Sequence, residues 1–294
     1  MRYLTIIFLF ITTFAIGQQQ MFLRSTPAAG VTGILDSYTG AAAAYATALL
    51  YSSYGGSCLR VRRDSDNAEQ DIGFSGQDID EAAINTFCSG ANCFVKTWYD
   101  QSGSGNNATQ DTTSSQPKIY DSTNGIIYEK SITSLDLDGA DALLSNFSGY
   151  SGDFALFTIS IHQGGLTNFI FGIDFRENAY ALHGSGGIII YVRNSVKWNG
   201  YNLGLYNSSF LLSSTLSGTN LNTYINGSGV NSTTSDPPRF SNYLSIGATY
   251  SQGSQTFANF FTGKIQAFIY FSSDQSANRA AIESAINNYY NTYP

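Results

Sequence analysis

The sequence predicts an all-β sandwich with a few short peripheral helices and a C-terminal helix. The 294-residue chain contains 20 Tyr, 20 Phe and 29 Gly, whereas charged residues make up only 12% of it. Aromatic residues favour strands, and Gly favours the turns between them. From residue 116 onward, short apolar segments follow one another at turn-sized intervals, which is typical of two-sheet sandwiches.

The first hundred residues mix predicted helices and strands. Residues 40–54, GAAAAYATALLYSSY, have apolar positions at helical spacing before a Gly pair, so we expect a helix there. Alternation across residues 59–74, with an Asp-Ser-Asp-Asn turn, predicts a hairpin. Residues 78–88 predict a short helix capped by Asp78, and residues 94–99 predict a strand.

The remainder of the chain is predicted to be mostly strands. Candidate strands cover residues 118–120, 126–128, 134–137, 154–161, 168–175, 187–192, 210–215, 222–225, 244–247 and 260–271. The Asn226-Gly227 pair favours a two-residue hairpin turn, because both residues tolerate positive φ. A helix is predicted at residues 277–290, with Ile282 and Ile286 on one face.

The N-terminus has the pattern of a secretory signal peptide. Arg2 precedes an apolar core at residues 4–16, which is shorter than the roughly 20 residues of a membrane span. We therefore expect a signal peptide at residues 1–17, an N-terminal extension at 18–37 and a single domain at 38–294. The protein is expected to be secreted, extracellular or at the cell surface, with no membrane insertion after signal removal.

The mature chain is expected to be acidic. The sequence has 14 Lys+Arg and 21 Asp+Glu, so loss of Arg2 leaves 13 basic residues and a net charge of −8. With no basic run longer than Arg62-Arg63, we expect no binding to nucleic acid. The sequence makes no prediction of an oligomeric state.

Three cysteines suit an oxidising compartment. Cys88 and Cys93 flank a short Ser-Gly-Ala-Asn turn that allows their thiols to meet, so we expect a disulfide between them. Closing so small a loop stabilises a fold by about 2 kcal/mol. Cys58 is then expected to be a buried free thiol. With two His and no Cys-x-x-Cys pair, no metal site is predicted from these residue types.

Four segments of the first half occur in the order of a known family. ALLYSSY, LRVRRDSD, FCSGANC and WYDQSGSGN follow one another between residues 38 and 110. This order resembles the start of the catalytic domain of α-L-arabinofuranosidase B, glycoside hydrolase family 54. Residues 135–144, 223–230 and 261–290 resemble concanavalin A-like and laminin-G-like jelly rolls. The resemblance implies that the sandwich is a concanavalin A-like jelly roll.

Asp100 follows a predicted strand and precedes a Gly-rich turn. In the resemblance, the Tyr-Asp-Gln-Ser-Gly element belongs to the framework, with the Asp closing a turn through backbone N–H groups. Local chemistry agrees, because Asp accepts such bonds readily and the Gln-Ser-Gly-Ser-Gly sequence bends sharply. We expect Asp100 to be a structural turn residue rather than a catalytic carboxylate.

The resemblance implies a two-carboxylate site in the second half of the chain. The family nucleophile is a Glu in a D-x-E sequence, and the acid/base is an Asp in G-G-D-N-S. Here residues 188–206 contain no acid, Tyr250 or a neighbour stands at the position of the Asp, and the adjacent Cys-Cys pair of the family is missing. Asp174 and Glu177 remain as a clustered pair, either catalytic or at a solvated strand end.

Two further groups are candidate binding residues. Asp136, Asp138 and Asp141 resemble a calcium loop in spacing, although acids at such positions also cap strand-to-turn transitions. We therefore expect no cofactor, with calcium as the alternative. The aromatic residues of the other group are expected to stack on sugar rings, with core packing as the alternative. They are Tyr191, Trp198, Tyr201 and Tyr206.

Because the family's functional signatures are missing while its framework signatures are present, we expect a non-catalytic module. The expected function is glycan binding or surface adhesion, with a polysaccharide or cell-surface glycan as the partner. The alternative is an α-L-arabinofuranosidase-like glycoside hydrolase that acts on arabinose-containing polysaccharide. A second alternative is a structural or decoration protein of an extracellular appendage or a virion.

Overall fold

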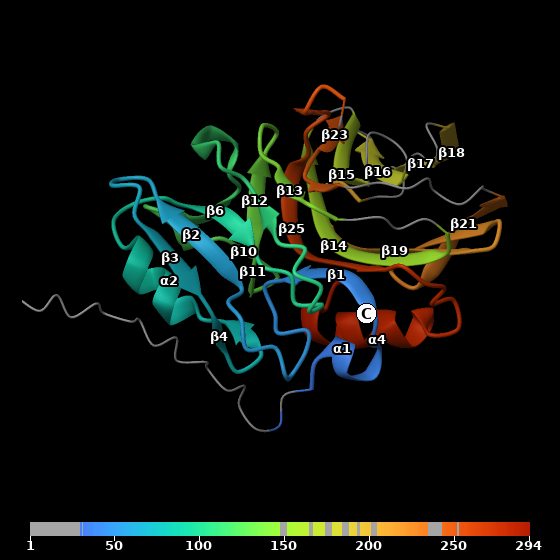
Figure 1. The fold of residues 1–294 in the computed structure, drawn as a ribbon, viewed down its shortest axis with the longest axis horizontal. Coiled ribbons are helices and arrows are strands. Elements are labelled where there is room, and N and C mark those ends of the chain that lie inside the picture. Colours follow the sequence, from blue (N-terminus) through green and yellow to red (C-terminus); the bar gives the residue numbers. More distant parts are fainter. Residues whose placement is uncertain are drawn as a thin grey trace, which may run out of the picture.

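The computed structural model describes most of the chain beyond the predicted signal peptide. The described residues are 30, 32–147, 152–164, 167–173, 178–183, 188–192, 195–200, 205–234, 243–251 and 253–294. They form an all-β jelly-roll sandwich with short helices at its periphery (Figure 1). Within them, no helix is both long and apolar enough to span a membrane.

The first sheet is built around the strand nearest the C-terminus. Its order is β21 (Ser228–Thr234), β20 (Asn220–Ile225), β19 (Ser209–Ser217), β14 (Phe154–Gly164) and β25 (Thr262–Phe271). The other edge of β25 pairs with both β1 (Ala41–Ala46) and β12 (Leu135–Asp138). All of these pairs are antiparallel, so the first sheet joins segments from the beginning, middle and end of the chain.

The second sheet faces the first. Its order is β18 (Ser195–Gly200), β17 (Ile188–Val192), β16 (Asn178–His183), β15 (Thr167–Ile173), β22 (Leu244–Ile246), β13 (Leu143–Ser145), β7 (Ala108–Thr109), β6 (Cys93–Trp98), β2 (Leu59–Arg63) and β3 (Glu69–Ile72). β8 (Lys118–Asp121) pairs with β6, β12 and β9 (Gly125–Ile126), and so links the two sheets.

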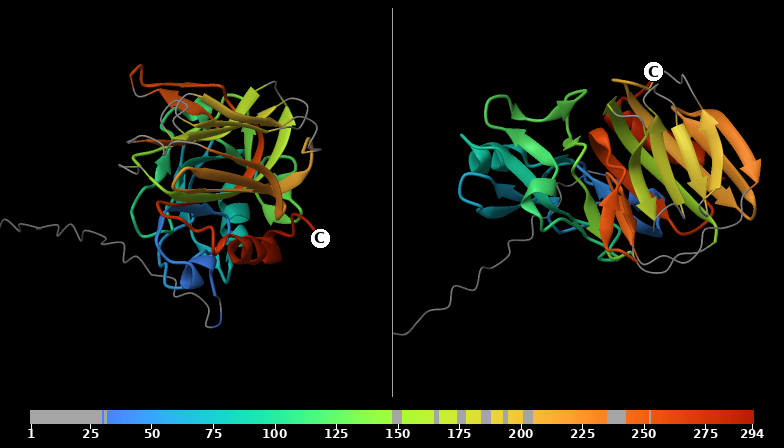
Figure 2. Two further views of the ribbon diagram at one scale, coloured as in Figure 1. Left: turned by 90° about the vertical axis from the view of Figure 1, so that its right-hand side faces the viewer. Right: turned by 90° about the horizontal axis from the view of Figure 1, so that it is seen from above.

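Small hairpins and helices complete the structure. The hairpins are β4 (Phe74–Ser75) with β5 (Asp78–Ile79), β10 (Tyr128–Glu129) with β11 (Ile132–Thr133), and β23 (Thr249–Ser251) with β24 (Thr256–Ala258). The helices are α1 (Ile34–Ser37), α2 (Glu81–Cys88) and α4 (Arg279–Tyr290), with a 3₁₀ turn at Thr113–Ser115. Seen from above, the α2 region and the β14–β21 region lie side by side, with β25 between them (Figure 2).

The two faces of β14 belong to different cores, because successive strand residues point in opposite directions. Phe154 faces the space between the sheets, where its ring stacks on Tyr270 of β25 at 5.9 Å. Phe157 faces outward, in a cluster that contains Ile282 and Ile286 of α4. Burying each such side chain stabilises the fold by about 1.5–3 kcal/mol. The α4 helix therefore covers the outer face of the first sheet.

The helix expected at residues 40–54 is wrong, because residues 41–46 form strand β1. All six residues of β1 are buried: Ala43 and Tyr45 face the inner core, whereas Ala44 and Ala46 face the outer one. A strand buried on both faces has no polar alternation, so its sequence is easily mistaken for that of a buried helix.

Other predicted elements are present with small changes. The turn between β20 and β21 has Asn226 at φ 50° and Gly227 at φ 77°, as a two-residue hairpin requires. The expected cap of α2 was Asp78, but Asp80 fills this role and accepts a hydrogen bond from the Ala83 N–H at 2.9 Å. Asp78 lies two residues earlier, in β5.

Asp100 is buried and ties the loop after β6 to strand β1. Its Oδ1 atom accepts hydrogen bonds from the N–H groups of Ala44 and Ser102, both at 2.9 Å. Its Oδ2 atom accepts from the Ser102 hydroxyl at 2.8 Å and the Asn106 N–H at 2.9 Å. With both carboxylate oxygens occupied by framework donors, Asp100 has the geometry of a turn residue.

Gln101 continues this attachment. It is fully buried, and its Oε1 atom accepts from the Leu50 N–H at 2.8 Å. Its Nε2 atom donates to the carbonyl oxygens of Ala46 and Ala48, both at 3.0 Å. Asp100 and Gln101 together therefore hold β1 and the chain that follows it, which leads into the region described next.

We predict that Asp100→Asn lowers the free energy of unfolding by about 3 kcal/mol, because an amide NH₂ would then face N–H and O–H donors. Urea denaturation of the purified protein measures this loss. Asp111→Asn is the matched control, since the Asp111 side chain is 90% exposed. An equal effect of the two substitutions would show that the Asp100 contacts do not stabilise the fold.

Candidate functional site

The cysteines are arranged as the sequence predicts. Cys88 and Cys93 form a disulfide, with their Cα atoms 5.9 Å apart. The bond joins the end of α2 to the start of β6. Cys58 is a buried free thiol, and its burial raises its pKa well above the usual value. Cys58 therefore stays protonated and unreactive in the folded protein.

The other candidate residues fall mostly outside the described residues. Asp174, Glu177 and Tyr201 lie there, as do the side chains of Tyr191 on β17 and Trp198 on β18. Described strands flank the acid pair: β15 and β16 pair antiparallel, with Ile173 opposite Asn178. The contribution of these residues to a site remains a proposal.

Tyr206 is described and is one of the few exposed large aromatic residues of the described chain, at 46% exposure. Its hydroxyl donates to the Gln163 carbonyl at 3.0 Å, and its ring meets that of His162 edge-on at 5.6 Å. One face of the ring thus borders solvent while its hydroxyl is tied to the framework. Tyr206 remains a candidate for stacking on a sugar.

Tyr250 stands where the resemblance implies the acid/base Asp. It lies on β23 and is buried, with its ring 5.2 Å from Tyr243 and 5.1 Å from Phe257. Burial and the neighbouring Tyr243 raise its pKa, so it is a neutral phenol. Tyr250 is a packing residue and offers no replacement for a catalytic carboxylate.

The three acids considered for calcium lie around the end of β12. The Asp141 Oδ2 atom accepts the Asp138 N–H at 3.0 Å, and Asp136 faces Lys118 and Lys264 across paired strands. Across the described segments, no three His, Cys, Asp or Glu side chains are grouped as metal ligands. These acids therefore have the geometry of a strand-to-turn cap.

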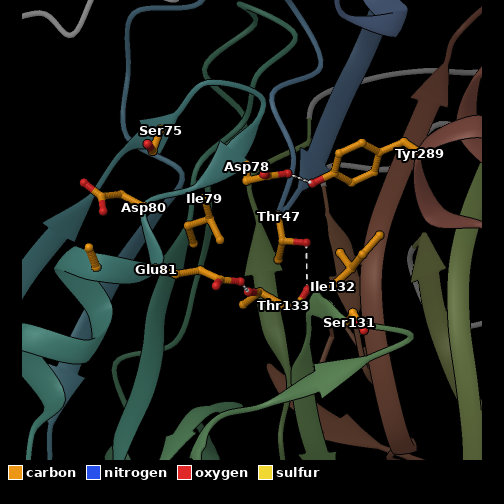
Figure 3. Close-up of a pocket in the computed structure, with 11 residues that line it drawn as sticks. Thr47, Ser75, Asp78, Ile79, Asp80, Glu81, Ser131, Ile132, Thr133 and Tyr289 are labelled. Carbon is orange, nitrogen blue, oxygen red and sulfur yellow. Dashed lines mark hydrogen bonds between the residues drawn. The ribbon is translucent and has the colours of Figure 1, made fainter.

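A polar cavity of about 340 Å³ lies beside α2 and α4 (Figure 3). Its walls come from the chain after β1, the β4–β5 hairpin, the start of α2, the β10–β11 hairpin and the C-terminal part of α4. The lining residues are Thr47, Ser75, Asp78, Ile79, Asp80, Glu81, Ala82, Ser131, Ile132, Thr133 and Tyr289. The volume is at the lower end of the roughly 300–1,000 Å³ typical of small-molecule sites.

Hydrogen bonds from separate elements hold the cavity wall in place. The Tyr289 hydroxyl donates to Asp78, and the Thr133 hydroxyl donates to Glu81 at 2.7 Å. The Thr47 hydroxyl donates to the Thr133 carbonyl at 2.8 Å. In Figure 3, Asp78 and Glu81 point toward the centre of the group, whereas the carboxylate of Asp80 points away from them. Asp78 and Glu81 are thus fixed acceptors on the cavity wall.

Tyr128 adds an exposed ring next to this cavity. Its hydroxyl donates to the second carboxylate oxygen of Glu81 at 3.0 Å, and its side chain is 41% exposed. Burial of the hydroxyl raises the pKa of Tyr128 to about 12, and the hydrogen bond to Glu81 acts in the same direction. The phenol therefore remains protonated, and the ring stays anchored at neutral pH.

Comparisons with known proteins relate the first half of this fold to a family of catalytic domains. Residues 35–151 match the family model described as α-L-arabinofuranosidase B, catalytic. A probable α-L-arabinofuranosidase B from Aspergillus fumigatus is 39% identical over 106 residues, which are 34% of this chain and 20% of the relative. The enzyme from Aspergillus niger is 37% identical over 92 residues, 30% of this chain and 18% of its own length. The chain therefore spans at most about a fifth of the curated relatives it matches.

Solved structures extend the likeness to the whole sandwich. A GH54 α-L-arabinofuranosidase soaked with a cyclic sulfate inhibitor has a TM-score of 0.63 at 16% identity, covering 86% of this chain and 64% of that one. An arabinofuranosidase complexed with arabinofuranosyl-α-1,2-xylobiose has a TM-score of 0.61 at 17% identity, with the same coverage. At this identity the likeness shows the fold. The chain therefore shares the β-sandwich fold of these structures, and its first half also resembles the GH54 catalytic domain in sequence.

The expectation of a non-catalytic glycan-binding or adhesion module is wrong. The sequence match is to a catalytic domain, and the solved structures with the same fold include arabinofuranosidases. The missing family acids prompted that expectation, but residues 35–151 carry the similarity without including those positions. The comparisons favour the hydrolase alternative.

We predict that Asp141 makes the protein less stable as the pH rises from about 4 to about 7. Burial raises the pKa of Asp141 to about 7, and the charges of Asp138 and Asp136 act in the same direction. The folded state therefore holds a proton that the unfolded chain releases near pH 4, and the resulting stabilisation is lost as the pH passes 7. Denaturation of wild type and Asp141→Asn across this range measures the difference in unfolding free energy.

The stability advantage of wild type over Asp141→Asn should shrink steadily toward pH 7.5. Asp111→Asn is the control for an Asp-to-Asn change at the surface, since the Asp111 side chain is 90% exposed. A constant difference between wild type and Asp141→Asn would contradict the prediction.

Proposed function

We propose that the protein is a glycoside hydrolase of the α-L-arabinofuranosidase type, acting on arabinose-containing polysaccharide. The match of residues 35–151 to the α-L-arabinofuranosidase B catalytic model carries this proposal. The matched segment contains the disulfide and the Asp100 turn, so the similarity extends to the contacts that hold the framework. A sandwich with the same fold as arabinofuranosidases supports the same conclusion.

Hydrolysis of a glycosidic bond by this route requires two carboxylates that face the sugar, about 5 Å apart in retaining enzymes. The resemblance implies that they come from the second half of the chain. After residue 150 the sequence contains six acids: Asp153, Asp174, Glu177, Asp236, Asp274 and Glu283. The catalytic pair must therefore be chosen from these six residues.

Three of these acids have structural partners. Asp153 accepts the Gly218 N–H at 2.8 Å, and Asp274 accepts the Ser276 N–H at 2.8 Å. Glu283 is buried and accepts hydrogen bonds from Ser213 and Arg279. Since these groups serve the framework and Asp236 has no second acid near it in the sequence, we assign the catalytic role to the clustered pair.

That pair is Asp174 and Glu177, between β15 and β16. One carboxyl group would protonate the leaving oxygen, and the other would attack the anomeric carbon or activate a water molecule. This chemistry needs no cofactor. The signal-like residues 1–17 support export, which would bring the enzyme to an extracellular polysaccharide. Pairing of β25 with β1 supports a single domain across residues 38–294.

We predict that the wild-type protein hydrolyses 4-nitrophenyl α-L-arabinofuranoside and releases arabinose from arabinan. Asp174→Asn and Glu177→Gln should each lower kcat/KM by at least about 10³-fold, because each removes one of the two groups on which the transition state depends. Release of 4-nitrophenol and of free arabinose gives the two rates.

Asp274→Asn is the matched control among the second-half acids and should stay within about twofold of wild type. Thermal unfolding of every variant checks that a loss of rate is not a loss of fold. Background turnover of both substrates by the wild type would overturn the proposed function. Full activity of Asp174→Asn and Glu177→Gln would overturn the assignment of the pair.

A further inference from the structure

Two open cavities flank the ring of Tyr289 on α4. The first is the 340 Å³ cavity that contains Asp78 and Glu81. The second, of about 310 Å³, lies toward α1, and Tyr289 lines it as well. Both exceed the lower limit of about 300 Å³ for small-molecule sites. Because one side chain borders both cavities, they form consecutive parts of one surface, defined here as the Tyr289 groove.

The first cavity accepts hydrogen bonds and repels anions. Each of its two inward carboxylates keeps acceptor capacity, since Asp78 receives the Tyr289 hydroxyl and Glu81 receives those of Thr133 and Tyr128. Among the residues that the structure describes, no Lys or Arg lines this cavity or the second one. A ligand must therefore donate hydrogen bonds and carry no negative charge.

The described lining of the second cavity carries no charged side chain. Its polar lining groups are hydroxyls and amides, from Thr32, Ser37, Gln77 and Asn288, and its aromatic groups are Tyr38 and Tyr289. Amides both donate and accept, as a row of sugar hydroxyls requires. A polycation would be attracted by the carboxylates of the first cavity alone and would gain no charge attraction in the second. The second cavity therefore does not favour a polycation as the ligand.

Aromatic rings supply the remaining feature of a sugar site. Tyr289 stands between the cavities, with its hydroxyl fixed by Asp78 and its ring against Tyr290 at 4.8 Å. Tyr128 offers a half-exposed ring beside Glu81. Both are held by hydrogen bonds from their hydroxyls, so little side-chain freedom is lost when a ring stacks on a ligand.

The groove lies on the opposite side of the sandwich from strands β15 and β16, which flank the proposed catalytic pair in the sequence. The α4 helix packs on the outer face of the first sheet, where Ile282 and Ile286 join the outer core. β15 belongs to the second sheet, and its Ile170 and Phe171 face the inner core. The labels in Figure 1 show the same separation, with α4 and α1 at the bottom and β15 and β16 at the top.

From these observations we propose that the Tyr289 groove binds a neutral oligosaccharide, as a site separate from the one that cleaves it; the choice of a pentose oligosaccharide rests on the proposed function. The ligand donates hydroxyls to Asp78 and Glu81, stacks a ring on Tyr289 and continues over the amides of Gln77 and Asn288. Binding at the groove does not depend on the proposed hydrolysis.

The test is isothermal titration of full-length Glu177→Gln with α-1,5-linked arabinopentaose and with xylopentaose, repeated with the wild type at low temperature. We expect a Kd on the order of 10 μM to 1 mM for at least one pentose oligomer, as for a shallow polar site. Ala285→Trp adds a bulky side chain to the lining of the second cavity and should weaken binding at least tenfold. Ala280→Trp is the matched control, on the exposed side of the same helix, and should bind within twofold of its parent.

Two further variants address the first cavity and the fold. Asp78→Asn keeps the size of the side chain and should weaken binding several-fold, and Asn288→Ala should weaken it without loss of thermal stability. Absence of binding by both oligomers, or equal binding by Ala285→Trp and Ala280→Trp, would overturn the groove. Trigalacturonate is an anionic sugar, and spermidine is a polycation. If the groove bound either of them more tightly than both pentose oligomers, the proposed ligand class would be overturned. Weakened oligomer binding by Ala285→Trp, with unchanged hydrolysis of 4-nitrophenyl α-L-arabinofuranoside when Ala285→Trp is made in the wild-type protein, separates this site from the catalytic one.

Discussion

The structure depends on the backbone of β25, which three strands share. One edge of β25 pairs with β14 along almost its whole length, and the other pairs with β1 and then β12. The approach of β14 is so close that a Cβ on Gly263 would lie 2.0 Å from the Ile161 carbonyl oxygen. Gly263 also has φ +146°, which side chains rarely tolerate. The central pairing thus requires glycine at this position.

The same strand positions the wall of the Tyr289 groove. The Gln266 carbonyl of β25 accepts the Thr47 N–H at 3.1 Å. The Nε2 atom of the Gln266 side chain donates to the carbonyl oxygens of Glu129 and Ile132, at 3.0 and 3.1 Å. One buried residue therefore attaches both the chain after β1 and the β10–β11 hairpin to the sheet. Since Thr133 of that hairpin holds Glu81, the position of the cavity carboxylate depends on β25 through two hydrogen bonds.

A buried carboxylate holds α4 on the same sheet. Glu283 accepts from Ser213 of β19 and from Arg279 one turn earlier, and the Arg279 guanidinium lies 3.8 Å from the centre of the Tyr224 ring. Burial raises the pKa of Glu283, whereas Ser213 and Arg279 lower it. These contacts fix the rotation of α4 and with it the direction of Tyr289. The groove is therefore attached to rigid elements on both of its sides.

Much of this fold could be predicted from local sequence, because turns carry their own chemistry. Asn226-Gly227, the Cys88–Cys93 pair and the Asp100 turn each lie within a few residues that specify them. Strand β1 could not be predicted from local sequence, since its Ala residues are buried by contacts with β25, more than 200 residues away. A periodic pattern of polar residues indicates an element with one exposed face, and β1 has no exposed face.

The groove could not be predicted for a related reason. Its residues come from segments around positions 47, 77, 131 and 289, and no segment contains a motif by itself. Asp78 was predicted as a helix cap, since a capping acid and a cavity acid look alike in sequence. Similarly, the absence of acid at residues 188–206 predicted loss of chemistry, whereas residues 35–151 match the model of a catalytic domain.

The proposed groove and the proposed catalytic site would together have a physical consequence for substrate type. A second weak site raises effective affinity only if both sites are occupied together, and a short oligosaccharide cannot pass around the sheets to do so. A branched or densely packed polysaccharide can, because neighbouring chains reach both faces at once. Retention would then depend on the density of the substrate more than on the affinity of either site. The two proposed sites together would therefore favour an insoluble polysaccharide matrix over soluble fragments, because released fragments engage one site and dissociate.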